Sequence, residues 1–497
     1  MSIKRLLIAN RGEIACRIIR ACRERGIASI AVFSDADRDA MHARMADDAV
    51  ALGGTTSAES YLDIDKLLAA ARESRADAVH PGYGFLSERA AFAKAVADAG
   101  LIFVGPPADV IARMGSKTDA RALAERAGVP VVPGAVAASQ DEAALLETVA
   151  SVGFPALIKA SAGGGGKGMR VVRSSGEAAA AIGAARREAQ AAFGDGTVYV
   201  ERLIERPRHI EIQVMADAHG NAVHLFERDC SVQRRHQKII EESPAPAIGA
   251  AVRARMGEAA VALAKAAGYV NAGTMEFLVE GEGDAARFYF LEMNTRLQVE
   301  HPVTEMVAGV DLVQAQLDVA DGLPLSWTQD ALAQRGHAIE CRIYAEAPAQ
   351  GFLPQAGRIL HWEQPSGPGV RVDAGFETGS DVAVHYDPLL AKLIATGATR
   401  GDAIRRALRA LDEFIVLGVR TNIAFLASVL ASDTFAAGQV HTRWVDEEAA
   451  TLAAAPPPEL AELAAQAASA TRDESGAIAG AGAVRPDPWR DLRGWGR

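Results

Sequence analysis

The N-terminal residues combine two short apolar runs with one segment of helical spacing. Residues 3–9 and 27–34 are apolar and predict strands, whereas residues 13–25 repeat apolar positions at helical spacing up to Gly26. This order is typical of the β-α-β unit of a dinucleotide-binding fold. Because Gly12 stands alone where such a site uses a glycine-rich pattern, we expect the fold without nicotinamide binding.

The middle of the chain predicts two Ala-rich helices separated by a glycine-rich hairpin. The helices are expected to begin with the S-x-x-E sequences of residues 139–142 and 174–177, which are typical of capping boxes. Between them, residues 155–161 and 169–173 predict two strands, joined by a Gly-Gly-Gly-Gly-Lys-Gly loop at residues 163–168. We expect this α+β region to be a small lid that closes on a ligand.

A third and larger region is predicted by strand-like segments at residues 201–215, 222–227 and 274–293. Beyond Leu452 the chain is rich in alanine and proline and has too few large apolar residues for a core of its own. The expected fold class is α/β, with a Rossmann-like N-terminal domain, the lid and a larger mixed-sheet C-terminal domain. The expected boundaries are residues 1–114, 115–203, 204–448 and 449–497.

Composition and charge limit the kinds of partner. The 497 residues are 49% hydrophobic and 23% charged, the balance of a soluble multidomain protein. Lys and Arg (52) are outnumbered by Asp and Glu (63), so we expect neither nucleic acid nor an anionic membrane surface as a partner. The apolar runs are too short for a membrane span. A cytoplasmic location is expected, with four scattered cysteines buried and reduced: Cys16, Cys22, Cys230 and Cys341.

Two strand-like segments flank a Gly/Asp-rich turn and predict a β-hairpin centred on Asp284. This register places Glu276 directly opposite Glu292, with Asn294 on the same face. Opposed carboxylates repel unless a cation bridges them, and an all-oxygen ligand set suits Mg²⁺ or Mn²⁺. The hairpin alone leaves a second interpretation open, in which both glutamates lie on a solvated face.

The glycine loop gives a second reason to expect a nucleotide. Its backbone N–H groups at residues 163–168 can approach phosphate closely, and Lys167 adds positive charge. The loop is not a Walker motif, because Met169 stands where Ser or Thr is required. Glycine runs are often plain linkers, but this one directly follows the strand that carries Lys159 and precedes the paired carboxylates. We therefore expect a phosphate lid over a metal-bound triphosphate.

Several longer strings carry a family resemblance. They are HPGYGFLSE at 80–88, MGSK at 114–117, QRRHQK at 233–238 and EMNTRLQVEHPVTE at 292–305, together with Lys159 before the glycine loop. In these strings the sequence resembles the ATP-grasp biotin carboxylases, over roughly the first nine tenths of the chain. The resemblance implies an ATP-grasp fold after the Rossmann-like domain. The implied activity is ATP- and bicarbonate-dependent carboxylation of the N1 of biotin through carboxyphosphate.

The resemblance also implies how ATP and its metal ions, two of Mg²⁺ or Mn²⁺, are bound. Two lysines and the glycine loop hold the phosphates, one segment lines the adenine, three polar side chains lie near the ribose and phosphates, and the hairpin binds the ions. In that order the implied residues are Lys117, Lys159, Gly165 and Gly166; Glu201, Arg202, Leu203 and Ile204; His209, Gln233 and His236; and Glu276, Glu292 and Asn294. Arg202 replaces the lysine that is usual in the family, which keeps the charge.

The same resemblance implies the sites of the other two substrates. Glu300 is the implied base that deprotonates bicarbonate, and Arg342 is the implied partner of the ureido oxygen of biotin. Tyr83 is implied beside biotin, although its place in a glycine-containing turn also allows a purely structural role. Lys238 and Arg296 complete the implied catalytic set. The residues implied around bicarbonate are Lys238, Arg296, Gln298 and Val299.

The implied partners are other polypeptides or other domains. The family carboxylates biotin on a carrier lysine, and no Met-Lys-Met carrier motif occurs here, so we expect a separate carrier, a carboxyltransferase subunit and a homodimer or larger complex. Residues 449–497, with Trp489 and Trp495, resemble the junction before a subunit-docking domain in α subunits of 3-methylcrotonyl-CoA and geranyl-CoA carboxylases. Two alternatives remain open: an ATP-grasp ligase that activates bicarbonate for a different acceptor, and a non-catalytic assembly subunit.

Overall fold

A parallel sheet at the N-terminus is the first layer of the computed structural model, which describes residues 3–161 and 168–453. Strand β1 (Arg5–Ile8), helix α1 (Gly12–Arg25) and strand β2 (Ala28–Phe33) form the predicted β-α-β unit. The other strands are β3 (Asp48–Ala51), β4 (Ala78–His80) and β5 (Ile102–Phe103), in the sheet order β3-β2-β1-β4-β5. All neighbours are parallel, which confirms the Rossmann-like prediction.

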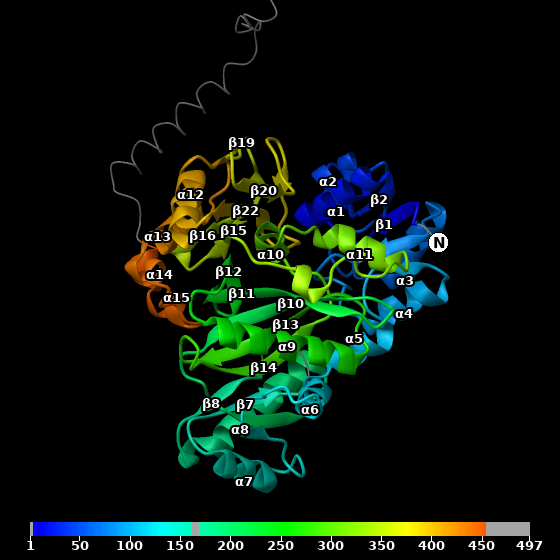
Figure 1. Ribbon diagram of the computed structural model, residues 1–497. Helices are drawn as coiled ribbons and strands as arrows, with labels where there is room; N and C mark the ends of the chain where they lie inside the picture. Colours follow the sequence, from blue (N-terminus) through cyan, green and yellow to red (C-terminus); the bar gives the residue numbers. More distant parts are fainter. Residues whose placement is uncertain (1–2, 162–167, 454–497) are drawn as a thin grey trace, which may run out of the picture. The chain divides into compact units, whose positions relative to one another are not determined.

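Helices cover both faces of this parallel sheet (Figure 1). Leu6 of β1 packs in one core with Ile14 and Ile18 of α1. Leu7, the next residue, points the other way and packs with helices on the opposite face. Those helices are α3 (Ile64–Glu73) and α4 (Ala90–Asp98), and α5 (Ala108–Gly115) and α6 (Lys117–Arg126) lead on to the lid.

The predicted lid is a four-stranded sheet on which two helices pack (Figure 1). Its elements are β6 (Gly134–Ala135), α7 (Glu142–Val152), β7 (Ala156–Ala160), β8 (Arg170–Val172), α8 (Ser175–Phe193) and β9 (Val198–Arg202), with the sheet order β6-β9-β7-β8. Antiparallel pairing of β7 with β8 confirms the predicted hairpin, in which Ile158 is opposite Arg170. The loop residues 162–167 lie outside the described part of the chain.

The helix starts in the lid differ from the predicted capping boxes. The N-cap of α7 is Asp141, not Ser139, and the Asp141 carboxylate accepts a hydrogen bond from the Ala144 amide at 2.9 Å. Ser174 does stand at the N-cap of α8, but its side chain makes no capping hydrogen bond. Asp141 rather than Ser139 caps the helix for two reasons. A carboxylate is favoured at the positive N-terminal end of a helix, and Asp141 is two residues closer to the first turn than Ser139.

The strand predicted at residues 201–215 is two strands in two different sheets. β9 ends at Arg202 in the lid, and β10 (Arg208–Ala216) begins the large sheet. Pro207 lies in the link between them, where it cannot donate a backbone hydrogen bond to a strand ladder. Glu201 therefore belongs to the lid, and His209 belongs to the body.

An eight-stranded sheet forms the body of the protein (Figure 1). Its order is β14 (Arg287–Asn294), β13 (Asn271–Glu280), β10, β11 (Ala222–Arg234), β12 (Gln237–Ser243), β15 (His337–Tyr344), β22 (Leu389–Gly397) and β20 (Val370–Ala374). Every neighbouring pair is antiparallel, where the sequence predicted a mixed sheet. Short turns between successive strands such as β10, β11 and β12 explain this, because a short turn can join only antiparallel neighbours.

Helices pack on both faces of the large sheet. Helix α9 (Ala250–Ala267) buries Met256 and Leu263 against Ile210 and Ile212 of β10. At the β15 end, α10 (His301–Ala308) packs on one face. In the chain, α12 (Arg400–Asp412) follows β22, and α13 (Ile423–Ala431) comes after the short strand β23 (Ile415–Leu417). The compact unit ends with α16 (Ala449–Leu452). Within the described ranges, no helix is both long and apolar enough to cross a membrane.

Candidate active site

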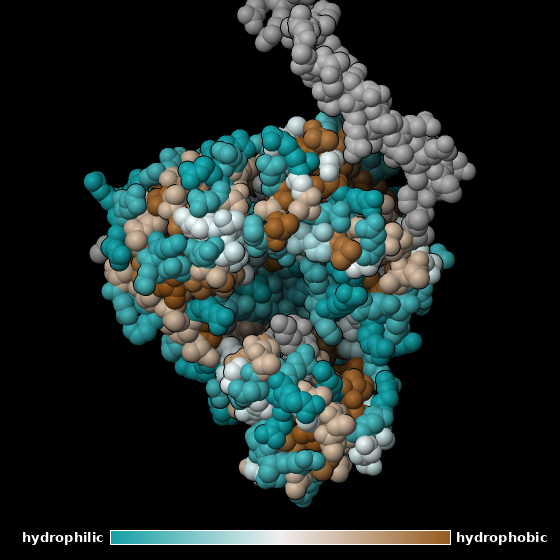
Figure 2. Space-filling view, turned by 180° about the vertical axis from the view of Figure 1, so that it is seen from behind, coloured by the Kyte–Doolittle hydropathy of each residue, from teal (hydrophilic) through white to brown (hydrophobic). Residues whose placement is uncertain are grey.

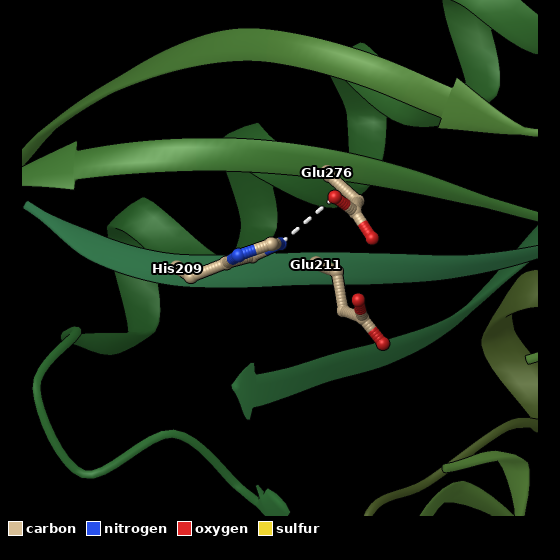
Figure 3. A group of neighbouring side chains, drawn as sticks. All are labelled: His209, Glu211 and Glu276. Carbon is tan, nitrogen blue, oxygen red and sulfur yellow. Dashed lines mark ion pairs between the residues drawn. The ribbon is translucent and has the colours of Figure 1, made fainter. Parts of the chain in front are cut away.

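Two neighbouring strands turn polar side chains to the face of the large sheet opposite α9. On β10, Ile210 and Ile212 pack toward α9, so His209 and Glu211 point to the other face. The same alternation on β13 turns Glu276 to this face. Figure 3 shows that His209, Glu211 and Glu276 come together there from the two strands. The alternation of side chains along these strands therefore places apolar residues in the core on one face and polar residues in the site on the other face.

The register of β13 and β14 confirms the predicted carboxylate pair. Glu276 is directly opposite Glu292. Nearer the turn the register shifts by one residue, because Phe277 pairs with Phe290 and Leu291 is left over as a β-bulge. The bulge restores the alignment that a hairpin centred on Asp284 predicted.

Glu276 is surrounded by hydrogen-bond donors. Lys238 Nζ lies 2.8 Å from Oε1, His209 Nε2 lies 3.0 Å from Oε2, and Asn294 Nδ2 donates to Oε1 at 2.8 Å. Burial would raise the pKa of Glu276, but Lys238 and His209 outweigh burial and hold the pKa far below its usual value. Glu292 shifts the other way, because burial and the facing charge of Glu276 raise its pKa.

This donor set fits a divalent cation. Glu276 and Glu292 offer carboxylate oxygens from facing strands, and a cation between them would relieve the repulsion that raises the pKa of Glu292. Asn294 turns its Nδ2 to Glu276 while its Oδ1 accepts from Arg296, so its amide must rotate to offer an oxygen to a metal. Mg²⁺ and Mn²⁺ prefer such oxygen ligands. The three predicted ligands lie together, and their metal role stays a prediction.

Lys238, on β12, joins three carboxylates. Its Nζ lies 2.5 Å from Glu211, 2.8 Å from Glu276 and 2.7 Å from Glu300. Burial would lower the pKa of Lys238, but these carboxylates outweigh burial and raise the pKa well above its usual value. Arg228, which is fully buried, adds a second cation at 2.6 Å from Glu211. Lys238 and Arg228 thus supply two fixed positive charges beside the carboxylates of the polar face.

Glu300 lies immediately before α10 and is fully buried. It accepts hydrogen bonds from Lys238 at 2.7 Å and from Arg342 at 2.9 Å. Burial would raise the pKa of Glu300, but Lys238, Arg342 and Arg228 outweigh burial and hold the pKa well below its usual value. Glu300 is therefore ionised and can accept a proton, as a general base must. Glu241 anchors Arg342 from the other side, at 2.6 Å from Nε.

Arg296 connects the body to the N-terminal region. Its Nε donates to Glu88 at 3.0 Å, its Nη1 to Gln298 at 2.9 Å and its Nη2 to Asn294 at 3.0 Å. Glu88 is the last residue of the HPGYGFLSE string, so that string reaches the site directly. Gln298 Nε2 also lies 3.3 Å from Glu276. The residues implied for bicarbonate thus lie beside the carboxylate cluster.

A cavity of about 430 Å³ opens beside Arg296 and Arg342. Val299 and Tyr83 also line it, and the Tyr83 hydroxyl is hydrogen-bonded to Glu13. Two of the four residues implied for bicarbonate, Arg296 and Val299, thus line the same cavity as the two implied for biotin. Figure 2 shows in addition that the molecule is hollowed above the lobe that contains α7 and α8, and that the surface of this hollow is hydrophilic.

The two lysines predicted for the ATP phosphates come from different elements. Lys159, on β7, is buried and lies 2.9 Å from Glu201 on β9. Burial would lower the pKa of Lys159, but Glu201 outweighs burial and raises it. Lys117, the first residue of α6, has a pKa lowered by burial, which the nearby Glu292 partly opposes. The charge of Glu292, one of the two facing carboxylates, thus acts on Lys117, and the phosphate-binding role of Lys117 stays a prediction.

The remaining residues predicted for ATP are spread more widely. Arg202 reaches from the lid to β13, where it forms an ion pair with Glu280 at 3.0 Å, and Leu203 and Ile204 follow it toward β10. Gln233 is buried, and its Nε2 has no hydrogen-bond partner among the residues that the structure places. His236 is exposed in the turn between β11 and β12, at a φ of 67°. Two predicted residues lie outside the described part of the chain: Gly165 and Gly166.

The structure adds residues that the sequence did not predict. They are charged side chains that hold the predicted residues in place: Glu88, Glu211, Arg228 and Glu241. For two of these four residues, the sequence contained a pattern that could have identified them. Glu211 shares a strand face with His209 by alternation, and Glu88 closes one of the family strings. No pattern in the sequence identified Glu241, because its partner Arg342 lies in a strand that is far along the chain.

Three family models match the chain. They are the biotin carboxylase N-terminal domain at residues 2–111, the ATP binding domain of the carbamoyl-phosphate synthase L chain at residues 116–328, and the biotin carboxylase C-terminal domain at residues 340–447. A biotin carboxylase of Nostoc sp. is 51% identical over 447 residues, which cover 90% of this chain and 99% of that protein.

The chain is also similar to a longer relative and to a solved structure. The mitochondrial methylcrotonoyl-CoA carboxylase subunit alpha of Rattus norvegicus is 48% identical over 447 residues, and the match covers 90% of this chain and 62% of that subunit. The chain thus spans less than two thirds of such subunits. The biotin carboxylase domain of the Hydrogenobacter thermophilus 2-oxoglutarate carboxylase, solved with MgADP, ADP and bicarbonate, has a TM-score of 0.87 and 41% identity, with 92% of this chain and 100% of that chain covered. Because the chain matches a biotin carboxylase over nearly the whole length of both proteins, it belongs to the biotin carboxylase family of ATP-grasp ligases.

Proposed function

We propose that the chain uses ATP and bicarbonate to carboxylate the N1 of carrier-bound biotin through carboxyphosphate, as the biotin carboxylase component of an acyl-CoA carboxylase. The observation that carries the proposal is the fully buried Glu300, which accepts hydrogen bonds from Lys238 and Arg342, next to the cavity that Arg342 lines. A carboxylate base beside two cations suits an anionic substrate that must lose a proton. The bicarbonate and MgADP in the Hydrogenobacter complex support the same substrates here.

Glu300 is the proposed base for bicarbonate. Bicarbonate is a poor nucleophile until it loses its proton, and Lys238 and Arg296 can offset the dianion that forms when Glu300 takes it. An anionic substrate also competes with Glu300 for Lys238, which makes Glu300 more basic when bicarbonate is present. The deprotonated oxygen then attacks the γ-phosphorus of ATP, ADP leaves, and carboxyphosphate is formed.

The nucleotide is proposed to lie across the lid and the hairpin. Lys117 and Lys159 would hold its phosphates, and Glu276, Glu292 and Asn294 would hold Mg²⁺ or Mn²⁺. A bound divalent ion supplies neutralising charge to the phosphate oxygens. The adenine and ribose are proposed to lie along residues 201–204 with His209, Gln233 and His236, and residues 165 and 166 are proposed to cover the phosphates.

Arg342 is the proposed partner of the acceptor. Carboxyphosphate breaks down to CO₂ and phosphate, and the phosphate can remove the N1 proton of biotin. The guanidinium then stabilises the negative charge on the ureido oxygen while N1 attacks CO₂. Tyr83 and Val299 line the same cavity and are proposed to contact biotin and bicarbonate, respectively.

Bicarbonate-dependent ATP hydrolysis that rises with free biotin is the decisive measurement. The full chain, assayed with ATP and Mg²⁺, is expected to need bicarbonate for ATP turnover and to form N-carboxybiotin when biotin is added. Bicarbonate-dependent turnover without any response to biotin would instead indicate a ligase with a different acceptor. No ATP turnover under any of these conditions would indicate a non-catalytic subunit.

Arg342→Ala is expected to separate the two half-reactions. Because the guanidinium acts on the acceptor, carboxylation of free biotin is expected to fall by about a hundredfold or more, the usual cost of losing an oxyanion donor, while bicarbonate-dependent ATP hydrolysis falls much less. Arg400→Ala is a matched control, since Arg400 pairs with Glu242 of the same sheet at 2.6 Å and lies outside the proposed site. Equal losses of both activities in Arg342→Ala would contradict the assigned role.

The final acceptor and the partners are part of the proposal. The similarity to methylcrotonoyl-CoA carboxylase alpha subunits supports a chain that acts with a biotin carrier and a carboxyltransferase, and that forms a homodimer or larger complex. The branched acyl-CoA class, with geranyl-CoA as the alternative, is proposed on the resemblance of residues 449–497 alone. A cytoplasmic location is proposed because all four cysteines are free and buried.

Removal of residues 454–497 is expected to leave carboxylation of free biotin within about twofold of the full chain, because every residue proposed for the site lies in the unit that ends at Leu452. The cut after α16 keeps Leu452, which is buried. The same truncation is expected to weaken association with the carboxyltransferase subunit, measured by analytical sedimentation of the mixed subunits. A large loss of free-biotin activity would show that the segment supports the catalytic unit directly.

A further inference from the structure

Two glutamates that the proposed reaction does not use lie behind Arg342. Glu241 of β12 is directly opposite Glu340 of β15, and both side chains are fully buried. Glu340 and Arg342 are two residues apart on one strand, so they share a sheet face. Glu241 anchors the guanidinium at 2.6 Å from Nε, and Arg342 donates on to Glu300. Glu241 thus directly supports Arg342, and Glu340 lies opposite Glu241 in the neighbouring strand.

These two carboxyl groups have unused oxygens. Within the described ranges, neither oxygen of Glu340 has a hydrogen-bond partner, and neither has Oε2 of Glu241. Directly opposite side chains have Cβ atoms about 5 Å apart, close enough for the two carboxyl groups to meet. A buried carboxylate without donors is costly, whereas a protonated carboxyl group has an O–H to donate. The free Oε2 of Glu241, on the residue directly opposite, is the acceptor that the register offers to an O–H on Glu340.

Charged and titratable groups surround this pair on its own two strands and on the elements packed against them. They are Arg342 and Cys341 of β15, Lys238 of β12, Cys230 of β11, Lys392 of β22, Asp373 of β20, and Glu300 and His301 at α10. Lys392, the cation that most opposes the effect of burial on Glu340, already contacts Val299 O at 2.9 Å and Glu13 at 3.3 Å.

The pKa directions agree with this geometry. Burial raises the pKa of Glu340 well above its usual value, and Lys392 only partly opposes the rise. Burial also raises the pKa of Glu241, to about 7, although Arg342 opposes burial there. Since Glu241 has the arginine as its direct partner and Glu340 has none, the proton belongs on Glu340 at neutral pH.

We propose that Glu340 is a positioning residue for biotin carboxylation: it carries a proton that it shares with Glu241, and this limits the pair to one negative charge and keeps Arg342 directed at the cavity. This inference rests on the proposed function and deepens it. If the pair loses its proton, two facing negative charges lie behind Arg342 and compete with the ureido oxygen for the guanidinium. Biotin carboxylation then falls as pH rises, while bicarbonate-dependent ATP hydrolysis, which does not need Arg342, is retained.

The first test is the pH profile of the full-length protein and three variants. Glu340→Gln keeps an N–H donor for Glu241 and cannot ionise, so the alkaline decline of kcat/KM for biotin is expected to move to higher pH or to vanish. Glu340→Leu removes the donor, and KM for biotin is expected to rise about tenfold, the usual effect of losing a hydrogen bond to a charged group. Glu242→Gln is the matched control, because Glu242 is the next residue, points to the opposite face and pairs with Arg400.

A second readout does not depend on turnover. The infrared spectrum of the wild-type protein at neutral pH is expected to contain the carbonyl stretch of a protonated carboxylic acid, and Glu340→Gln is expected to lose that band. Because the pKa of Glu340 is raised in the folded state, its ionisation costs stability as pH rises above the usual carboxyl range. The unfolding temperature of Glu340→Gln relative to wild type is therefore expected to increase with pH.

The outcomes separate this inference from the proposed function. An unchanged alkaline limb in Glu340→Gln, or an infrared spectrum without the acid band, overturns the role of Glu340. A wild-type protein that shows no biotin-dependent turnover overturns the proposed function instead, and the infrared band then still decides whether Glu340 holds a proton. If Glu340→Leu does not fold, the isosteric Glu340→Gln supplies the pH profile and the spectrum by itself.

Discussion

Glu300→Gln is expected to lower both bicarbonate-dependent ATP hydrolysis and biotin carboxylation by about 10²- to 10⁴-fold, the range that general acid–base catalysis contributes. The amide has nearly the shape of the carboxylate, but it cannot take the proton of bicarbonate. Lys238 keeps Glu211 and Glu276 as partners, and Arg342 keeps Glu241, so the fold should survive. Steady-state assays of both activities check the prediction.

The matched control for this variant is Glu305→Gln. Glu305 is also buried and also ion-paired, at 3.0 Å from Arg17 and 2.7 Å from Arg371, but it has no proposed role in the reaction. It is expected to lose stability and to keep both activities. An equal fall of activity in the two variants would mean that Glu300 acts by supporting the fold.

The pH dependence of stability gives a further check on Glu300. Its folded pKa lies well below the usual value, so the ionised form stabilises the protein above the unfolded pKa. This stabilisation is lost as pH falls through the folded value. The difference in unfolding free energy between wild type and Glu300→Gln is therefore expected to be largest near neutral pH and to shrink in acid. A difference that grows in acid would contradict the ion-pair assignment.

The local part of the site could be predicted from the sequence. A turn and two strands fix which residues are opposite each other, and this was enough to pair Glu276 with Glu292. The prediction did not include the bulge at Leu291, because an extra residue in one strand leaves no mark in the hydrophobic pattern. The parallel N-terminal sheet was equally accessible, since residues 3–34 contain the whole β-α-β unit.

The charge network could not be predicted, because its partners are far apart in the chain. Lys238 of β12 contacts Glu211 of β10, Glu276 of β13 and Glu300 before α10, and these meet only after the sheet order is formed. The direction of each pKa shift depends on that assembly. Glu300 is ionised by its cations, whereas the equally buried Glu340 lacks them, and nothing in the sequence distinguishes the two.

Glu292→Gln is expected to lower ATP turnover by at least about a hundredfold at ordinary Mg²⁺ concentrations, because even the hydrogen-bond partners of metal ligands typically cost ten- to a hundredfold. The change removes one of two facing carboxylates. Burial and the charge of Glu276 raise the pKa of Glu292, and a bound cation would relieve the repulsion between the two carboxylates. Stability is expected to rise slightly in the metal-free protein, because one member of a repelling pair becomes neutral.

Metal binding separates this prediction from a general loss of activity. Titration with Mn²⁺, followed by electron paramagnetic resonance, is expected to show weakened binding in Glu292→Gln, and higher Mn²⁺ is expected to restore part of the turnover. Glu282→Gln is the matched control, because Glu282 is an exposed carboxylate in the turn of the same hairpin. Wild-type Mn²⁺ affinity and wild-type turnover in Glu292→Gln would show that the facing carboxylates hold no metal, and that Lys238 and His209 alone neutralise Glu276.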